Sequence, residues 1–107
     1  MWNGVELRRR YDFSIFVNSR AYSGVVIDPH YQIRHFKSMN DHLILKLMKE
    51  ISGRNYLPTG VSQEGWEIYV NDPVMFENKL YRVIWCSHTS EDYLGVINAF
   101  RRTRQRS

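Results

Sequence analysis

One segment near the middle of the chain restricts the fold more than any other, because its apolar residues recur at helical spacing. The residues of this apolar face are Leu43, Ile44, Leu47, Met48 and Ile51. The opposite face is charged and carries Lys46, Lys49 and Glu50. Ser38 and Asp41 form a start that resembles a capping box, and Gly53 supplies a stop. A helix with one apolar face must bury it, so we expect about three to four turns packed on a β-sheet.

Runs rich in aromatic and β-branched residues on both sides of this helix predict the strands of that sheet. They cover residues 13–17, 22–27, 66–70, 80–86 and 93–103. A turn at 18–20 makes the first two a hairpin, and Asn71-Asp72-Pro73 is expected to close the third. Because short links favour antiparallel pairing, the sequence predicts an α+β fold. Its parts are an N-terminal β-hairpin and one main amphipathic helix on an antiparallel sheet of about four strands.

More detailed expectations concern the core and the limits of the domain. The helix is expected to pack against Trp66, Ile68, Val83 and Trp85. Arg82 is the single charge in an otherwise apolar strand, so we expect it to project from the open face of the sheet. Residues 30–36 are ambiguous between a short helix and a loop. Residues 1–107 are expected to form one domain, with 1–10 and 103–107 flexible.

The net charge is concentrated at one end of the chain. Fifteen Lys and Arg against eleven Asp and Glu give +4, and residues 101–107 hold four of the arginines and no acid. Residues 1–100 are therefore neutral overall, with eleven charges of each sign. Since this basic end continues an apolar, strand-like run, it is placed to deliver guanidinium groups to a polyanion such as phosphate. A solubilising terminus fits the same composition.

The sequence does not support several classes of function. The single cysteine, Cys86, lies in an apolar run and is expected to be a buried, unreactive thiol. The four histidines lack zinc-site spacing, and no P-loop, dinucleotide fingerprint or Gly-x-Ser-x-Gly motif is present. No apolar stretch reaches the roughly 18 residues of a transmembrane helix. We therefore expect no metal, no small-molecule cofactor and no membrane span, in a reducing, cytoplasmic setting.

What remains is a set of residues suited to cleaving RNA without a metal. It comprises His30, Tyr31, Arg34 and His35 before the helix, and Arg101 and Arg102 at the end of the last strand. Cleavage through the 2′-hydroxyl needs a base, an acid and fixed positive charge at the phosphate. Histidine can take either proton role near neutral pH, arginine clamps phosphate, and tyrosine can stack on a base. Structural roles for the two histidines, at a turn and at the helix entrance, fit the sequence equally well.

Between residues 25 and 102, a strand leads into the run DPHYQIRH, the capped helix DHLILKLMKEI and three strands that end in GVINAFRR. This order resembles the small ribonuclease toxins of the RelE and BrnT kind, and the C-terminal toxin domains of bacterial polymorphic and contact-dependent inhibition systems. The residues that the resemblance implies to be catalytic are His30, His35, Arg82 and Arg101. Those expected to contact RNA are Tyr31, Arg34, Arg102 and Arg104.

The resemblance implies an endoribonuclease toxin that acts in the cytoplasm and is held in check by a protein inhibitor, either an antitoxin or an immunity protein. The hairpin over about residues 11–28 is an addition to the compact RelE-like pattern. It favours free RNA, such as tRNA, over ribosome-bound RNA as the target. Two alternatives stay open: a non-catalytic nucleic-acid-binding module, and a partner-binding protein of the immunity or antitoxin kind. The chain is also compatible with a delivered toxin domain or a piece of a larger protein.

Overall fold

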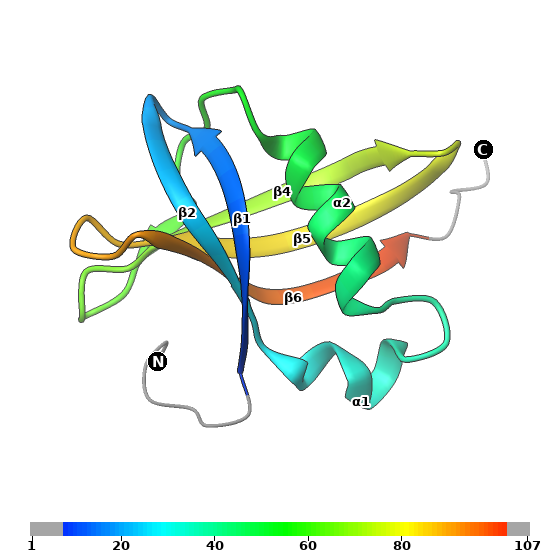
Figure 1. Cartoon of the computed structure of the whole chain (residues 1–107). Coiled ribbons are helices and arrows are strands. Elements are labelled where there is room, and N and C mark those ends of the chain that lie inside the picture. The colour runs from blue at the N-terminus through cyan, green and yellow to red at the C-terminus, as the bar shows by residue number, and fades with distance from the viewer. Residues whose placement is uncertain (1–7, 103–107) are drawn as a thin grey trace.

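A computed structural model describes residues 8–102, in which strands flank a central helical region. The strands are β1 (Arg9–Val17), β2 (Arg20–Ile27), β3 (Gly60–Val61), β4 (Glu67–Phe76), β5 (Lys79–Ser87) and β6 (Tyr93–Arg102). The helical elements are η1 (Pro29–Tyr31), α1 (Gln32–His35) and α2 (Asp41–Ile51). Figure 1 shows α2 lying across the sheet, with α1 beside one end of it. None of the helices in residues 8–102 has the length and apolar character needed to cross a bilayer.

The sheet has six strands in the order β1-β2-β6-β5-β4-β3. Neighbouring strands run antiparallel except β2 and β6, which run parallel with Gly24 opposite Tyr93. The predicted α+β class is therefore confirmed, but the expected antiparallel sheet of about four strands is wrong. The N-terminal hairpin belongs to the same sheet, because β2 pairs with β6. Gly24 and Tyr93 are 69 positions apart (93 − 24), so no local pattern signals this pairing.

The helix α2 begins and ends at polar groups that satisfy its terminal backbone. Asn40 is the N-cap, and its side-chain oxygen accepts a 2.8 Å hydrogen bond from the N–H of Leu43. Ser38, which was expected to start the helix, lies outside it, and its N–H donates to the His35 carbonyl. At the other end Gly53 has a φ of +90°, so the predicted glycine stop is confirmed.

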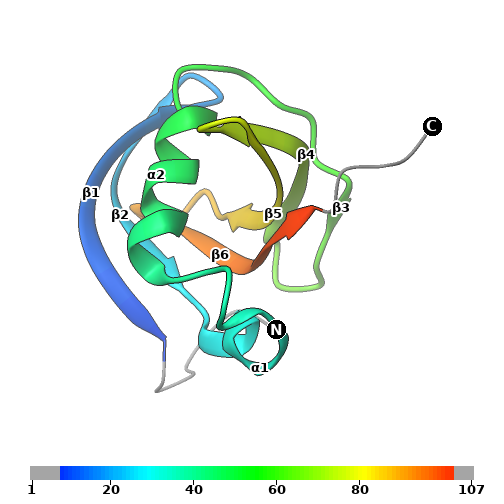
Figure 2. The same cartoon turned by 90° about the vertical axis from the view of Figure 1, so that its right-hand side faces the viewer.

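The core lies between α2 and the concave face of the sheet, which curls around the helix (Figure 2). The buried residues of the helix are Ile44, Leu47, Met48 and Ile51, as predicted. Leu43 is only partly buried at the edge of this core. Val83 and Trp85 of β5 are fully buried in the same cluster, which confirms this part of the predicted contact.

A second, smaller cluster lies on the other face of the sheet. Trp66 and Ile68, which were expected to pack against the helix, belong to this cluster together with Cys86. Ile68 is opposite Cys86 in the β4–β5 ladder, and successive residues of a strand point to opposite faces. The β4 strand therefore presents the opposite set of alternating residues to α2 from the set that was predicted, and Trp66 and Ile68 face away from the helix. Cys86 is fully buried, as predicted, and this burial raises the pKa of its thiol to about 12.

The β4 strand does not end at Asn71-Asp72-Pro73 as predicted, but continues to Phe76. The β4–β5 pairing shifts register between Asn71 and Val74, which marks a β-bulge. Proline cannot donate to a ladder, and a bulge is one of the places where a strand tolerates it. The bulge places Asp72 beside the open face of the sheet instead of in a terminal turn.

Leu47→Ala is expected to lower the free energy of unfolding by about 2–5 kcal/mol, because the Leu47 side chain is fully buried under the sheet and its removal leaves a cavity. Urea unfolding followed by tryptophan fluorescence measures this loss. Leu57→Ala is the matched control, since Leu57 is 89% exposed and its truncation should change stability by less than about 0.5 kcal/mol. Equal midpoints for the two variants would contradict the assignment of Leu47 to the core.

Candidate phosphate-binding and proton-transfer site

Two arginines converge on one carboxylate on the face of the sheet that points away from α2. Arg82 of β5 binds Asp72 at 2.9 Å, and Arg102 of β6 binds the other oxygen of the same carboxylate. In the β5–β6 ladder Arg82 lies opposite Phe100, and Arg102 is two residues further along, so all three share one face. The Arg82 side chain is 37% exposed and the Arg102 side chain is 38% exposed. Arg82 thus projects from the open face, as its isolated position in an apolar strand predicts.

The cluster of Arg82, Arg102 and Asp72 has a net positive charge, because two guanidinium groups share one carboxylate. Burial opposes ionisation of Asp72, but hydrogen bonds from Arg82 and Arg102 outweigh that effect and lower the pKa of the carboxyl. The carboxylate therefore stays ionised at neutral pH and neutralises one of the two cations. Each guanidinium has five N–H donors, so both retain donors for a further anion. The arrangement can hold a phosphate with its charge offset by one surplus arginine.

His35 brings an imidazole to the same place from a different part of the chain. Its ring stacks on Phe100 with centroids 4.8 Å apart and planes 22° from parallel. Phe100 lies across the ladder from Arg82 and shares its face of the sheet, so Phe100 links the imidazole to the face that carries the arginine pair. Neither nitrogen of His35 forms a hydrogen bond with another residue in the range 8–102. The ring is thus held by stacking and keeps its nitrogen atoms available for proton transfer.

The local sequence explains why His35 reaches this position. The Asp28 side chain accepts a 2.8 Å hydrogen bond from the His30 N–H, and Pro29 occupies the first turn, so η1 starts directly after β2. The chain then continues into α1, which resolves the ambiguous segment as helical. Because η1 packs on β6, the C-terminal end of α1, where His35 lies, is positioned against Phe100.

The other predicted site residues are placed in different surroundings. His30 is exposed on η1 and Arg34 is exposed on α1, close in sequence to His35. Arg101 is exposed at the end of β6, but it lies opposite Tyr81 and therefore on the α2 side of the sheet. Arg82 and Arg101, both predicted to be catalytic, thus lie on opposite faces. Arg104 lies outside the described residues.

Tyr31, which was predicted to contact RNA, is instead part of the hydrophobic core. Only 2% of the residue is exposed, so its ring has no free face for a base. Its hydroxyl donates a 2.6 Å hydrogen bond to Asp41, the first residue of α2. Burial, together with this bond, raises the pKa of Tyr31 to about 12. The phenol therefore stays protonated and serves as an anchor.

Asp41 is the centre of a network that joins three elements near the site. It accepts hydrogen bonds from Arg9 and Tyr11 of β1 and from Tyr31 of η1. Burial raises the pKa of Asp41, but the hydrogen bonds from Arg9 and the two tyrosines prevail and lower it to about 2. The network fixes the start of α2 against β1 and η1, and so supports the segment that carries His35.

Asp41 makes the stability of the fold sensitive to acid. The pKa of this carboxyl is 3.8 in an unfolded chain and about 2 in the folded protein, so the ionised carboxylate stabilises the fold above pH 3.8. That contribution, about 2 kcal/mol, is lost as the pH falls toward 2. Urea unfolding at neutral and acid pH should show a smaller acid-dependent loss for Asp41→Asn than for wild type. Asp12→Asn, which changes an exposed acid of β1, is the control and should follow wild type.

Compared with protein-family models, curated proteins and solved structures, the chain matches none. Its site must therefore be interpreted from its own geometry.

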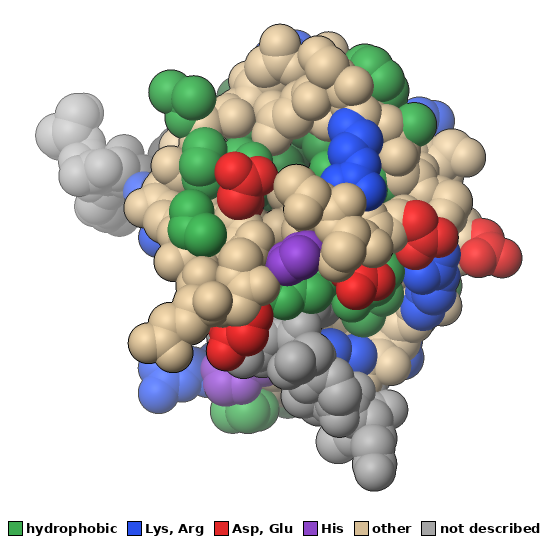
Figure 3. All heavy atoms as spheres, turned by 90° about the vertical axis from the view of Figure 1, so that its left-hand side faces the viewer, with side chains coloured by type: hydrophobic (Ala, Val, Ile, Leu, Met, Phe, Trp, Pro, Cys, Tyr) green, Lys and Arg blue, Asp and Glu red, His purple; other side chains and the backbone are tan. Residues whose placement is uncertain are grey.

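The rest of the surface provides a useful contrast to the arginine pair. Figure 3 shows a face on which acidic and basic side chains are interspersed. Two arginines of the β1–β2 hairpin are engaged with neighbouring groups: Arg10 binds Asp92, and Arg20 donates to the carbonyls of His88 and Glu91. These arginines act as structural links, with little capacity left for an anion.

Sequence reasoning did not identify Phe100 or Asp72 as parts of the site. Phe100 directly precedes the predicted Arg101, but only the strand register places it under His35 and across from Arg82. Asp72 was interpreted as a turn residue because proline follows it. No local signal singles out Asp72, because Glu77, Glu91 and Asp92 lie at least as close to Arg82 along the chain.

Proposed function

We propose that this protein is a metal-independent endoribonuclease that cleaves RNA through attack of the 2′-hydroxyl. The observation that carries the proposal is the imidazole of His35, stacked on Phe100 beside the Arg82–Arg102 pair. Proton transfer and fixed positive charge are the two things this reaction requires of a protein. The groups proposed to supply them are the His35 imidazole and the guanidinium groups of Arg82 and Arg102, which come from segments far apart in the sequence.

In the proposed reaction the 2′-oxygen forms a bond to phosphorus while the bond from phosphorus to the 5′-oxygen breaks. The proton of the 2′-hydroxyl goes to a base, and the departing 5′-oxygen receives a proton from an acid. His35 performs one of these transfers, and we assign the other to His30, which is exposed five positions earlier. Arg82 and Arg102 bind the non-bridging oxygens and stabilise the charge that develops on them. Asp72 is a positioning residue that holds the two guanidinium groups together.

The biological setting is proposed from the resemblance in the order of elements. It is that of a toxin acting in the cytoplasm on free RNA such as tRNA, neutralised by an antitoxin or immunity protein. Whether the chain acts alone or as a delivered domain does not alter the chemistry. An inhibitor that covers the His35 side of the sheet would block the site directly.

The deciding experiment incubates a labelled RNA and its 2′-deoxy counterpart with purified protein in excess chelator. We expect cleavage of the RNA alone, with a 2′,3′-cyclic phosphate at the new end. Cutting of the 2′-deoxy strand, or loss of cleavage in chelator, would overturn the mechanism. If no cellular RNA is cut, the arginine face is better explained as a non-catalytic nucleic-acid-binding surface, which filter binding under the same conditions detects.

A further inference from the structure

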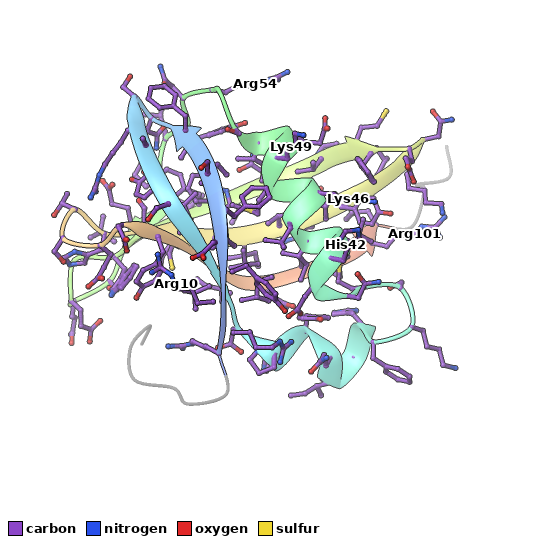
Figure 4. The ribbon with its side chains drawn as sticks, viewed as in Figure 1. Arg10, His42, Lys46, Lys49, Arg54 and Arg101 are labelled. Atoms are coloured by element: carbon purple, nitrogen blue, oxygen red, sulfur yellow. The ribbon has the colours of Figure 1, made fainter. Side chains whose placement is uncertain are left out.

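The outward face of α2 carries a row of basic side chains that the proposed reaction does not use. His42, Lys46 and Lys49 are all exposed and lie one helical turn apart. At 1.5 Å of rise per residue, the steps between them are roughly 6 Å and 4.5 Å along the axis. Arg54, also exposed, follows in the loop after the helix. Figure 4 shows these four residues succeeding one another along α2 and its C-terminal end.

This row, the α2 basic row (His42, Lys46, Lys49 and Arg54), is not neutralised by neighbouring acids. None of the four forms an ion pair with another residue in the part of the chain that the structure describes. The acids of α2 are Asp41, which is paired with Arg9, and Glu50, which makes no ion pair with Lys46 four residues before it. The charges of Lys46, Lys49 and Arg54 are therefore available to an external anion, unlike that of Arg10, which is paired with Asp92.

A cavity of about 250 Å³ lies at the end of the row, between α2 and β4. Arg54 and Glu50 border it, and Tyr56 and Asn71 form part of its wall. The Asn71 side-chain oxygen accepts a 2.7 Å hydrogen bond from the Trp85 indole, and its amide group also interacts with the Tyr56 hydroxyl, so the polar wall of the cavity is held in place. The cavity is smaller than the roughly 300–1,000 Å³ of sites for drug-sized ligands, and the Arg54 and Glu50 side chains at its border supply a donor and an acceptor to a flat polar group.

We infer that the α2 basic row binds the sugar–phosphate backbone of a single RNA strand and that the cavity receives one unpaired base of that strand. The inference rests on the proposed function and extends its substrate beyond the cleaved bond. Repeated cations at regular spacing suit a repeating phosphate chain, whereas the cores of protein–protein interfaces are depleted in lysine. A single strand is specified because a base enters a cavity only when it is free of its stack.

The test measures binding of a labelled 2′-deoxy single strand, which the proposed reaction leaves intact. Lys46→Gln/Lys49→Gln should weaken binding on the order of tenfold at low salt, and should flatten the slope of log Kd against log salt by about 1.4. Arg10→Gln, which removes an exposed arginine already paired with Asp92, should leave the slope unchanged. The duplex of the same sequence should bind wild type more weakly than the single strand. An unchanged slope in the double variant, or tighter duplex binding, overturns the inference.

Cleavage assays separate this inference from the proposed function. If wild type cuts RNA, the double variant should lose at least about tenfold more activity on a long RNA than on a ribodinucleotide that contains only the cleaved bond. Equal losses on the two substrates would place α2 in the reaction itself and overturn the inference. If wild type cuts no RNA, the proposed function fails, while the 2′-deoxy binding measurement still decides whether the α2 basic row holds a strand.

Discussion

His35→Ala is expected to lower the rate of RNA cleavage by about 10²–10⁴-fold, the usual effect of losing a general acid or base. The imidazole stacks on Phe100 beside the arginine pair, and its nitrogen atoms make no hydrogen bond within residues 8–102. Single-turnover cleavage of a labelled RNA measures the loss. Thermal melts accompany it, because His35 is only partly buried and its removal should leave the fold intact.

His35→Phe is the matched control for the stacking role of the ring. It preserves an aromatic contact with Phe100 but removes both nitrogen atoms, so its activity should fall as far as that of the alanine variant. Wild-type activity in His35→Phe would show that the ring only packs, and proton transfer would then have to be assigned elsewhere. A substrate with a leaving group that needs no protonation distinguishes the two proton roles, since it rescues the variant only if His35 is the acid.

Arg82→Ala and Arg102→Ala are each expected to reduce cleavage by about 10²–10³-fold, because each removes a preorganised charge from the phosphate. Lysine at either position should restore only part of the activity, since it keeps the charge and loses the planar fork. The measured quantity is kcat/KM on the same RNA. In each variant Asp72 retains one arginine partner, which limits the effect on folding.

Arg101→Ala is the control for this pair, because Arg101 adjoins Arg102 in sequence but lies on the α2 side of the sheet. We expect it to lose far less activity than Arg102→Ala. The family resemblance implies a catalytic role for Arg101 and only RNA contact for Arg102, so the comparison also tests whether strand alternation identifies the residue that binds the phosphate. Equal losses at positions 101 and 102 would move the phosphate from the open face to the end of β6.

The sequence predicted the features that depend on local periodicity. The buried face of α2 and its glycine stop follow from helical spacing and from the backbone freedom of Gly53. The exposure of Arg82 follows from its isolation in an apolar strand. Pairing of β2 with β6 could not be predicted, because parallel partners 69 positions apart leave no mark on either segment.

The candidate site was predictable in residue type but not in arrangement. Histidine and arginine were the predicted reactive groups, and the candidate site contains both, yet the choice between Arg101 and Arg102 depends on the exact register of β6. Tyr31 resembled a surface aromatic because it stands among polar residues, and only the position of Asp41 shows why it is buried. Residues that act through a partner in another element lie beyond what one-dimensional patterns encode.

The place of β6 in the sheet determines when, during synthesis, the fold can be completed. β6 is the last strand of the described residues, yet it lies between β2 and β5 and holds the two halves of the sheet together. A growing polypeptide can form the β1–β2 hairpin and α2 early, but the hairpin has no strand to join until β6 is available. The same strand supplies Phe100 and Arg102. A chain still in synthesis therefore has neither a complete sheet nor a complete candidate site, and the proposed chemistry could begin only after β6 is in place.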